Sequence, residues 1–163
     1  MSSAGSNQIA ASIWLGQALS FYSVDKNLAI VSRIWDEIWN KGALEVSDEV
    51  FTQDYLGHLP IMTVQGPQEF KNLVKVYLAA FPDVHLSVED AFGVDDRVTV
   101  RWISRGTHMG PMMGIPPSQH KIEVMGISIF RMAEGRVAEE WEGFDTLGMM
   151  QQLGAAGAAP TGA

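Results

Sequence analysis

The sequence contains no cysteine, and this absence removes several kinds of chemistry at once. Without a thiol the chain has no disulfide, no thiolate nucleophile and no zinc or iron–sulfur site held by cysteine. Basic residues are also scarce, because 11 lysines and arginines face 19 aspartates and glutamates, for a formal net charge of −8. Nucleic acids and anionic membranes repel such a chain, so we expect neither as a partner.

Long hydrophobic runs are missing as well. Charged or turn residues interrupt every apolar stretch before it reaches the roughly 18 residues of a membrane span. No lysine or arginine precedes Lys26, whereas a secretory signal begins with a positively charged segment. We therefore expect a cytoplasmic protein that does not span a membrane.

The motifs that hold common cofactors are absent too. The sequence has no P-loop, no dinucleotide-binding glycine pattern and no Gly-x-Ser-x-Gly elbow. No two histidines are one or four residues apart, which is the spacing that metal sites favour; the histidines are His58, His85, His108 and His120. We expect neither a metal nor an organic cofactor, which leaves general acid/base chemistry.

What the chain does contain is a surplus of apolar residues. Its 163 residues suit one domain, and 47% of them are hydrophobic while 18% are charged. The surplus predicts a ligand cavity, a subunit interface or both. We expect an N-terminal extension over residues 1–24, partly helical around 9–21, then one domain over 25–153 and a flexible tail over 154–163.

Hydrophobic periodicity changes from helical to strand-like at Pro82. Before it, steps of three and four predict helices over 25–40, 44–51 and 68–81, with an extended segment at 54–60. After it, a period of two predicts strands over 84–94, 97–108, 121–132 and 136–145. This order favours an α+β fold in which a strongly curved antiparallel sheet wraps around N-terminal helices, forming a cone that holds a small hydrophobic molecule.

Asp145 is the leading candidate for a catalytic group. By alternation it shares a face with Trp141 at the end of a mostly apolar strand, where desolvation raises the pKa of a carboxyl group toward neutrality. Such a carboxyl both donates and accepts protons. The alternative is that Asp145 caps a following helix over residues 146–153. Spacing alone leaves both interpretations open.

Further site candidates surround this strand. His108 ends the second strand beside a methionine-rich loop, so it either takes part in catalysis or is a structural histidine. Arg101 lies either in the cavity or on the outer face. Tryptophan and methionine are commonly core residues, but they also suit a flat hydrophobic ligand. The residues that we assign to substrate binding are His58, Arg101, Trp141, Met125 and Met112.

Four segments carry a recognisable pattern: Trp39-Asn-Lys-Gly42 with Asp54-Tyr-Leu-Gly-His58-Leu-Pro60; Ala80-Phe-Pro-Asp83; Arg101-Trp-Ile-Ser-Arg-Gly-Thr-His108 through Gly114-Ile-Pro-Pro117; and Gly126-Ile-Ser-Ile-Phe-Arg131 through Trp141-Glu-Gly-Phe-Asp145 to Gly154. Over about residues 26–154 the chain resembles the SnoaL-like polyketide cyclases, a branch of the nuclear-transport-factor-two-like superfamily.

The resemblance implies a cone-shaped α+β barrel, a homodimer and a hydrophobic pocket without a cofactor. It also implies that the aspartate of a Trp-x-x-x-Asp pattern in the last strand acts as acid and base, which is Asp145 here, and it places His58 and His108 in the pocket. The implied reaction is an intramolecular aldol-type ring closure of an aromatic polyketide ester.

Other functions fit the same cone. A related branch of the superfamily hydrolyses epoxides with an Arg-x-Asp pattern on one strand, but this chain has Arg101-Trp-Ile103 there. An isomerase and a non-catalytic small-molecule binding domain are the remaining alternatives.

Overall fold

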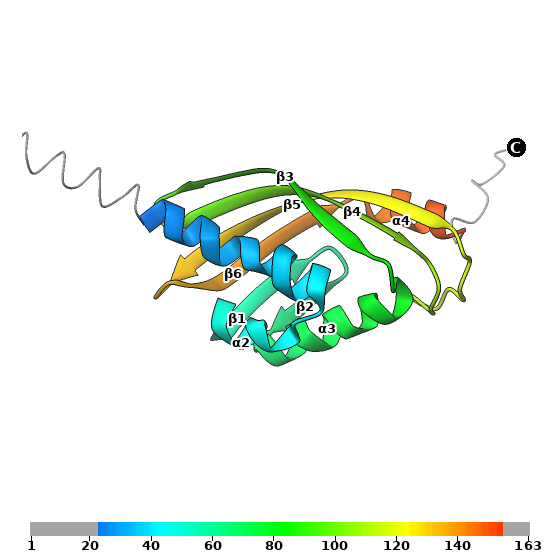
Figure 1. Cartoon of the computed structure of the whole chain (residues 1–163), viewed down its shortest axis with the longest axis horizontal. Coiled ribbons are helices and arrows are strands. Elements are labelled where there is room, and N and C mark those ends of the chain that lie inside the picture. The colour runs from blue at the N-terminus through cyan, green and yellow to red at the C-terminus, as the bar shows by residue number, and fades with distance from the viewer. Residues whose placement is uncertain (1–22, 155–163) are drawn as a thin grey trace, which may run out of the picture.

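One curved sheet of six strands organises the fold in the computed structural model, which describes residues 23–154 (Figure 1). The strand order is β2-β1-β6-β5-β4-β3, and neighbours are antiparallel except β1 and β6, which run parallel. No pairing joins β2 to β3 within the described residues, so the sheet is not closed. The strands are β1 Phe51–Leu59, β2 Met62–Gln65, β3 His85–Val94, β4 Arg97–Thr107, β5 Lys121–Ala133 and β6 Arg136–Phe144.

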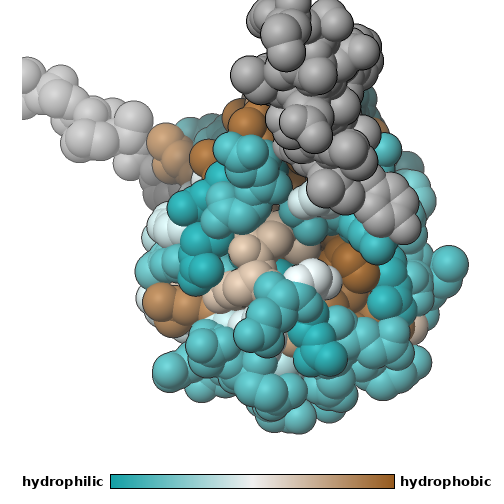
Figure 2. All heavy atoms as spheres, turned by 90° about the vertical axis from the view of Figure 1, so that its left-hand side faces the viewer, coloured by the Kyte–Doolittle hydropathy of each residue, from teal (hydrophilic) through white to brown (hydrophobic). Residues whose placement is uncertain are grey.

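A long helix over residues 23–41 runs along the sheet (Figure 1). Two shorter helices, α2 and α3, contact the last turns of the long helix, and α4 lies at the end of the sheet opposite to the start of the long helix. Seen from the end at which the long helix starts, hydrophilic residues surround a smaller hydrophobic area (Figure 2). No helix within residues 23–154 is long and apolar enough to cross a membrane. The other helices are the short 3-10 turn η2 Leu44–Val46, α2 Ser47–Val50, α3 Gly66–Ala80 and α4 Thr146–Leu153.

The long helix widens into a π-helical turn, η1, at Ile34–Trp39. Within it Ile34, Trp35 and Ile38 are buried, and the Trp35 ring packs edge-on against Phe130 of β5 at a centroid distance of 5.7 Å. The helix end is fixed by Asn40, whose side-chain amide donates to the Leu86 carbonyl at 2.9 Å and accepts from the Leu86 N–H at 2.8 Å. The helix is thereby held against the core and against the edge strand β3.

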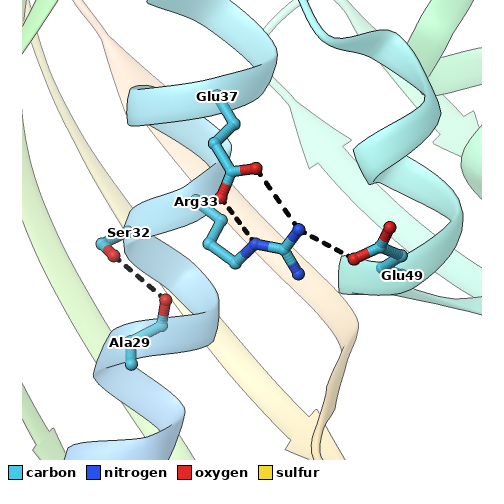
Figure 3. A network of polar contacts seen from close by, with 5 residues as sticks. All are labelled: Ala29, Ser32, Arg33, Glu37 and Glu49. Atoms are coloured by element: carbon cyan, nitrogen blue, oxygen red, sulfur yellow. Dashed lines mark hydrogen bonds and ion pairs between the residues drawn. The ribbon is translucent and has the colours of Figure 1, made fainter.

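An arginine links the long helix to α2 (Figure 3). Arg33 donates through Nε to Glu37 at 2.7 Å and through a terminal nitrogen to Glu49 at 2.8 Å. These hydrogen bonds raise the pKa of Arg33, and the one to Glu37 lowers the pKa of that carboxyl group. Partly exposed ion pairs add little net stability, so the network mainly fixes how the two helices lie.

The inward face of the sheet depends on a glycine in β5. Side chains of β5 alternate between buried and exposed along the whole strand, as the period of two predicts. At Gly126 a Cβ atom would collide with the ring of Trp102 on β4. The indole can therefore lie across β5, where its Nε1–H donates to the Ser128 hydroxyl at 3.1 Å.

The sequence predicted most elements but not the full sheet. The predicted helices over 25–40 and 68–81 and the four later strands are confirmed within a few residues. The helix predicted over 44–51 ends earlier, because Phe51 already starts β1. The parallel pairing of β1 with β6 joins segments about 80 residues apart, which local periodicity does not report. The predictions for residues 1–22 and 155–163 lie outside the described residues.

Candidate active site

A cavity of about 70 Å³ lies between the long helix, α3 and the concave face of the sheet. Its wall is mostly apolar, and the hydroxyl and carboxyl groups that reach it belong to Tyr77, Ser104, Glu140 and Glu142. No lysine or arginine of the described residues lines it. The aromatic wall residues are Trp35, Trp39, Phe70, Tyr77, Phe81, Trp102 and Phe144.

The two carboxyl groups come from the inward face of β6. The pairing of β5 with β6 shifts register between Arg131 and Met132, next to a point in β6 where Val137 and Ala138 are both buried. After this irregularity the even positions point inward, and Glu140 is only 4% exposed while Glu142 is half-buried. Strand alternation places these two side chains next to each other on one face.

Glu140 is held from the neighbouring strand. The hydroxyl of Tyr55 on β1, which is fully buried, donates to Glu140 Oε2 at 2.7 Å. Burial and the nearby Glu140 charge raise the pKa of Tyr55, so the tyrosine keeps its proton and remains a donor. The parallel pairing of β1 with β6 is what brings this donor to the carboxyl group.

Ser128 supplies a second donor to the pair. It lies opposite Glu142 in the β5–β6 register. Because an indole N–H only donates, Ser128 must accept from Trp102 and keeps its own O–H free for a carboxyl group. Hydrogen bonding by Ser128 partly offsets the rise in the pKa of both glutamates.

The two carboxyl groups together hold about one proton near neutral pH. Burial raises the pKa of Glu140 to about 7, against the hydrogen bonds from Tyr55 and Ser128. Burial and the charge of Glu140 raise the pKa of Glu142 to about 8. Since Tyr55 donates to Glu140 and not to Glu142, Glu140 takes the negative charge and Glu142 takes the proton. The site therefore offers one proton donor and one proton acceptor in an apolar cavity.

Asp145, predicted as the catalytic group, lies elsewhere. It is exposed and is the N-cap of α4, where its Oδ1 accepts from the Gly148 N–H at 2.8 Å. The prediction that it lies in the pocket is wrong, and the alternative of a helix cap is confirmed. The cause is the face assignment, because the set containing Trp141 and Gly143 points outward from β6.

His108 and Met112 lie behind the cavity wall rather than on it. His108 is fully buried, its ring packs against Phe81 at 5.4 Å, and its Nδ1 accepts from the Ser118 N–H at 3.2 Å. This bond ties the two ends of the loop over residues 108–118 together. Met112 belongs to a second hydrophobic cluster beside Phe81 and Met149. Neither side chain lines the cavity, and the buried His108 Nε2 has no hydrogen-bond partner among residues 23–154, so the roles predicted for both residues stay predictions.

The other predicted binding residues lie on the convex face. His58 stacks on Trp141 with ring centroids 5.6 Å apart and bonds to Glu139 at 3.0 Å. Arg101 pairs in register with the outward Ile127, and Met125 is 54% exposed. None of these residues lines the cavity, and for Arg101 the alternative of the outer face holds; their assignment to substrate binding stays a prediction. Both faces of β5 carry apolar side chains, so the sequence pattern did not indicate which face is concave.

Glu140 and Glu142 are the site residues that the sequence analysis missed. The sequence contains one sign of their position, because two adjacent apolar residues, Val137 and Ala138, break the alternation of β6. This break shifts the inward-facing positions of the strand by one residue. No group of three or more histidine, aspartate or glutamate side chains within residues 23–154 is arranged to hold a metal ion. The expectation that the protein uses no cofactor stays a prediction.

Comparison with known proteins gives a consistent family. Residues 29–153 match the family described as SnoaL-like polyketide cyclase. A Jannaschia sp. CCS1 protein assigned as a SnoaL-like polyketide cyclase is similar, with a TM-score of 0.76 and 27% identity over 83% of this chain and 95% of that one. IdmH of Streptomyces antibioticus, assigned as a polyketide cyclase, has a TM-score of 0.69 and 28% identity over 78% of this chain and 98% of that one. No curated protein matches the chain.

The fold extends beyond proteins assigned as cyclases. AclR of Streptomyces galilaeus, assigned as a hydroxylase, has a TM-score of 0.73 at 23% identity, over 85% of this chain and 87% of that one. At this identity the likeness concerns the fold alone. The predicted cone-shaped α+β fold is confirmed, with an open rather than closed sheet.

The raised pKa of Glu142 predicts that the protein becomes less stable as pH rises. The carboxyl group ionises near 4.5 in the unfolded chain and near 8 in the folded one, so the folded state binds more protons between these values. The free energy of unfolding therefore falls with rising pH across this window. We expect Glu142→Gln to remove about 3 kcal/mol of this fall, measured by urea unfolding at pH 5 and pH 8.

Glu139→Gln is the control on the same strand. Hydrogen bonds from His58 and Arg131 lower the pKa of Glu139. The contribution of Glu139 to the free energy of unfolding is therefore lost only as pH falls toward this lowered pKa. In Glu139→Gln the free energy of unfolding should fall between pH 5 and pH 8 by as much as in the wild-type protein. If the free energy of unfolding of Glu142→Gln falls as much as that of the wild-type protein, Glu142 is ionised throughout the range from pH 5 to pH 8.

The capping role of Asp145 makes a separate prediction. Asp145→Ala should lower the free energy of unfolding by about 1 kcal/mol, because α4 loses the acceptor for its first free N–H groups. Asp145→Asn should retain most of this stability, since asparagine caps as well as aspartate. Urea unfolding of both variants measures the difference. If Asp145→Asn is fully stable but has lost turnover, Asp145 has a chemical role after all.

Proposed function

The chain belongs to the SnoaL-like polyketide cyclase family, and from that premise we propose that Glu140 and Glu142 close a ring in a polyketide-like carbonyl substrate without a cofactor. The reaction is an intramolecular aldol addition. The single observation that supports it is the pair of adjacent carboxyl groups in an apolar cavity, with raised pKa values of about 7 and about 8.

The proposed reaction moves two protons and forms one bond. The charged carboxylate of the pair takes a proton from a methylene carbon next to a carbonyl group, leaving an enolate. The electron pair of the enolate carbon attacks a ketone carbon elsewhere in the same molecule and forms the new C–C bond. The protonated carboxyl, Glu142, gives its proton to the ketone oxygen, which becomes a hydroxyl group. The pair again holds one proton afterwards, so no other reactant is needed.

The apolar wall supports this chemistry in two ways. It holds the reactive ends of a flexible substrate together, so the entropy of bringing them together is lost on binding and no longer adds to the reaction barrier. It also keeps water away from the carboxyl groups, which maintains their raised pKa values. A fused-ring substrate needs more than about 70 Å³, so wall side chains must turn aside when it binds; the half-buried aliphatic Leu59 and Leu73 are the candidates.

The alternative activities have less support. Epoxide hydrolysis by the Arg-x-Asp arrangement needs a cation in the cavity, but Arg101 lies on the outer face. A plain binding domain has no need of two buried carboxyl groups, because burying them costs stability. Cytoplasmic residence stays a prediction from the sequence.

Glu142→Gln tests the proposed acid. The assay uses a synthetic aromatic ester whose side chain places a methylene group and a ketone for closure of a six-membered ring. We expect kcat to fall by about 100-fold or more, because glutamine has no proton to give. Glu139→Gln, one residue from Glu140 but on the outer face, should keep wild-type turnover. Equal turnover in all three proteins would contradict the proposal.

We further propose that the chain forms a homodimer through the convex face of the sheet. Four large apolar side chains are exposed there on β5 and β6: Met125 (54%), Ile127 (47%), Ile129 (41%) and Trp141 (37%). Outward-facing Arg97, which lies over the Trp141 ring at 5.2 Å, borders this patch. A second copy offers the same surface, so apolar residues meet apolar ones around a two-fold axis.

Ile127→Arg tests this interface. We expect the wild-type protein to have the mass of two chains in light scattering and Ile127→Arg to have the mass of one, since two arginines would be buried against each other. Val76→Arg is the control, because Val76 is a comparably exposed (54%) side chain on α3. A wild-type protein that has the mass of one chain at high concentration would refute the dimer.

A further inference from the structure

Tyr77 places a hydroxyl group in the cavity that no part of the described protein uses. The residue lies on α3 and lines the cavity that also contains Glu142. Within residues 23–154 its hydroxyl has no hydrogen-bond partner, in contrast to that of Tyr55, which donates to Glu140. Tyr77 is half-buried and lines an apolar cavity, so its hydroxyl is free to donate to a ligand that enters there.

The ring of Tyr77 is held in place by its surroundings. Trp39 packs edge-on against it, with ring centroids 5.7 Å apart and an interplanar angle of 90°. Trp39 itself packs edge-on against Phe70 at 6.3 Å. The hydroxyl is thus carried by a fixed aromatic cluster on the helical side of the cavity, while the carboxyl groups come from the sheet.

Tyr77 is also suited to remain a donor. Burial, with the charge of Glu142 as a second cause, raises the pKa of Tyr77 to about 12. The hydroxyl therefore stays protonated throughout the range in which the two carboxyl groups exchange protons.

We propose that Tyr77 donates a hydrogen bond to the substrate oxygen that becomes charged when the methylene carbon loses its proton. This inference rests on the proposed ring closure and adds a role that the carboxyl pair does not fill. When the carboxylate removes the proton, negative charge develops on the oxygen of the adjacent carbonyl group. A fixed donor at that oxygen stabilises the enolate more than the neutral ketone, which lowers the barrier to proton removal.

The first test measures binding and needs no turnover. The probes are 2-naphthol, which presents an oxygen, and naphthalene, which has the same ring system without one. We expect Tyr77→Phe to weaken 2-naphthol binding by about tenfold in a fluorescence titration and to leave naphthalene binding unchanged. Near-ultraviolet circular dichroism checks that the Trp39 packing is retained. Equal 2-naphthol affinity in both proteins would overturn the proposal.

The second test isolates the step at which Tyr77 acts. An analogue of the synthetic ester that lacks the acceptor ketone cannot close a ring but can still exchange its methylene protons for deuterium. We expect Tyr77→Phe to slow this exchange by tenfold or more, measured by proton NMR. Weaker 2-naphthol binding with an unchanged exchange rate would mean that Tyr77 binds an oxygen but does not stabilise the enolate, and would refute the inference.

These tests separate the inference from the proposed function. If Tyr77→Phe slows exchange while Glu142→Gln closes rings at the wild-type rate, Tyr77 has its role and the assignment of Glu142 as acid fails. If Glu142→Gln is inactive while Tyr77→Phe exchanges normally, the cyclase proposal stands and the role of Tyr77 fails.

Discussion

Two carboxyl groups lie next to each other on the inward face of one strand, and the rest of the site depends on their mutual repulsion. In an apolar cavity two such groups do not both ionise near neutral pH, so one keeps its proton. The Tyr55 hydroxyl decides where the charge resides, because it donates to Glu140, whereas Ser128 favours the charged form of both glutamates. Glu142, repelled by that charge, retains the proton at the cavity surface.

The fold serves this arrangement at several distant points. Parallel pairing brings β1, and with it Tyr55, beside β6. Gly126 allows the Trp102 indole to cross β5 and orient Ser128. The long helix, held at its end by Asn40, covers the carboxyl groups with an aromatic wall. Each of these features supports a pair of groups that destabilises the folded protein at neutral pH, which is typical of functional sites.

The sequence predicted the fold better than the site. Helical and strand periods identified the long helix, α3 and four strands, because each depends on local burial. The order of helices and strands predicted the curved sheet, and the family resemblance implied the same cone-shaped fold. The site was missed because alternation reports that Glu139 and Trp141 share a face, but not which face is concave. A one-residue irregularity at Val137 and Ala138 reverses which residues of β6 face inward. Glu140 and Glu142 therefore face the cavity, and Asp145 caps α4.

The shared proton is tested most directly by carbon NMR of protein labelled at the glutamate carboxyl carbons, titrated from pH 4 to pH 10. We expect two carboxyl signals with apparent pKa values near 7 and near 8, which Glu140→Gln and Glu142→Gln variants assign to the pair. Since the charge of Glu140 raises the pKa of Glu142, Glu140→Gln should lower the pKa of Glu142, whereas Glu142→Gln should leave the pKa of Glu140 near 7. If every glutamate signal has finished titrating by about pH 5.5, the pair holds no proton at neutral pH, and Glu142 is not the proton donor of the site.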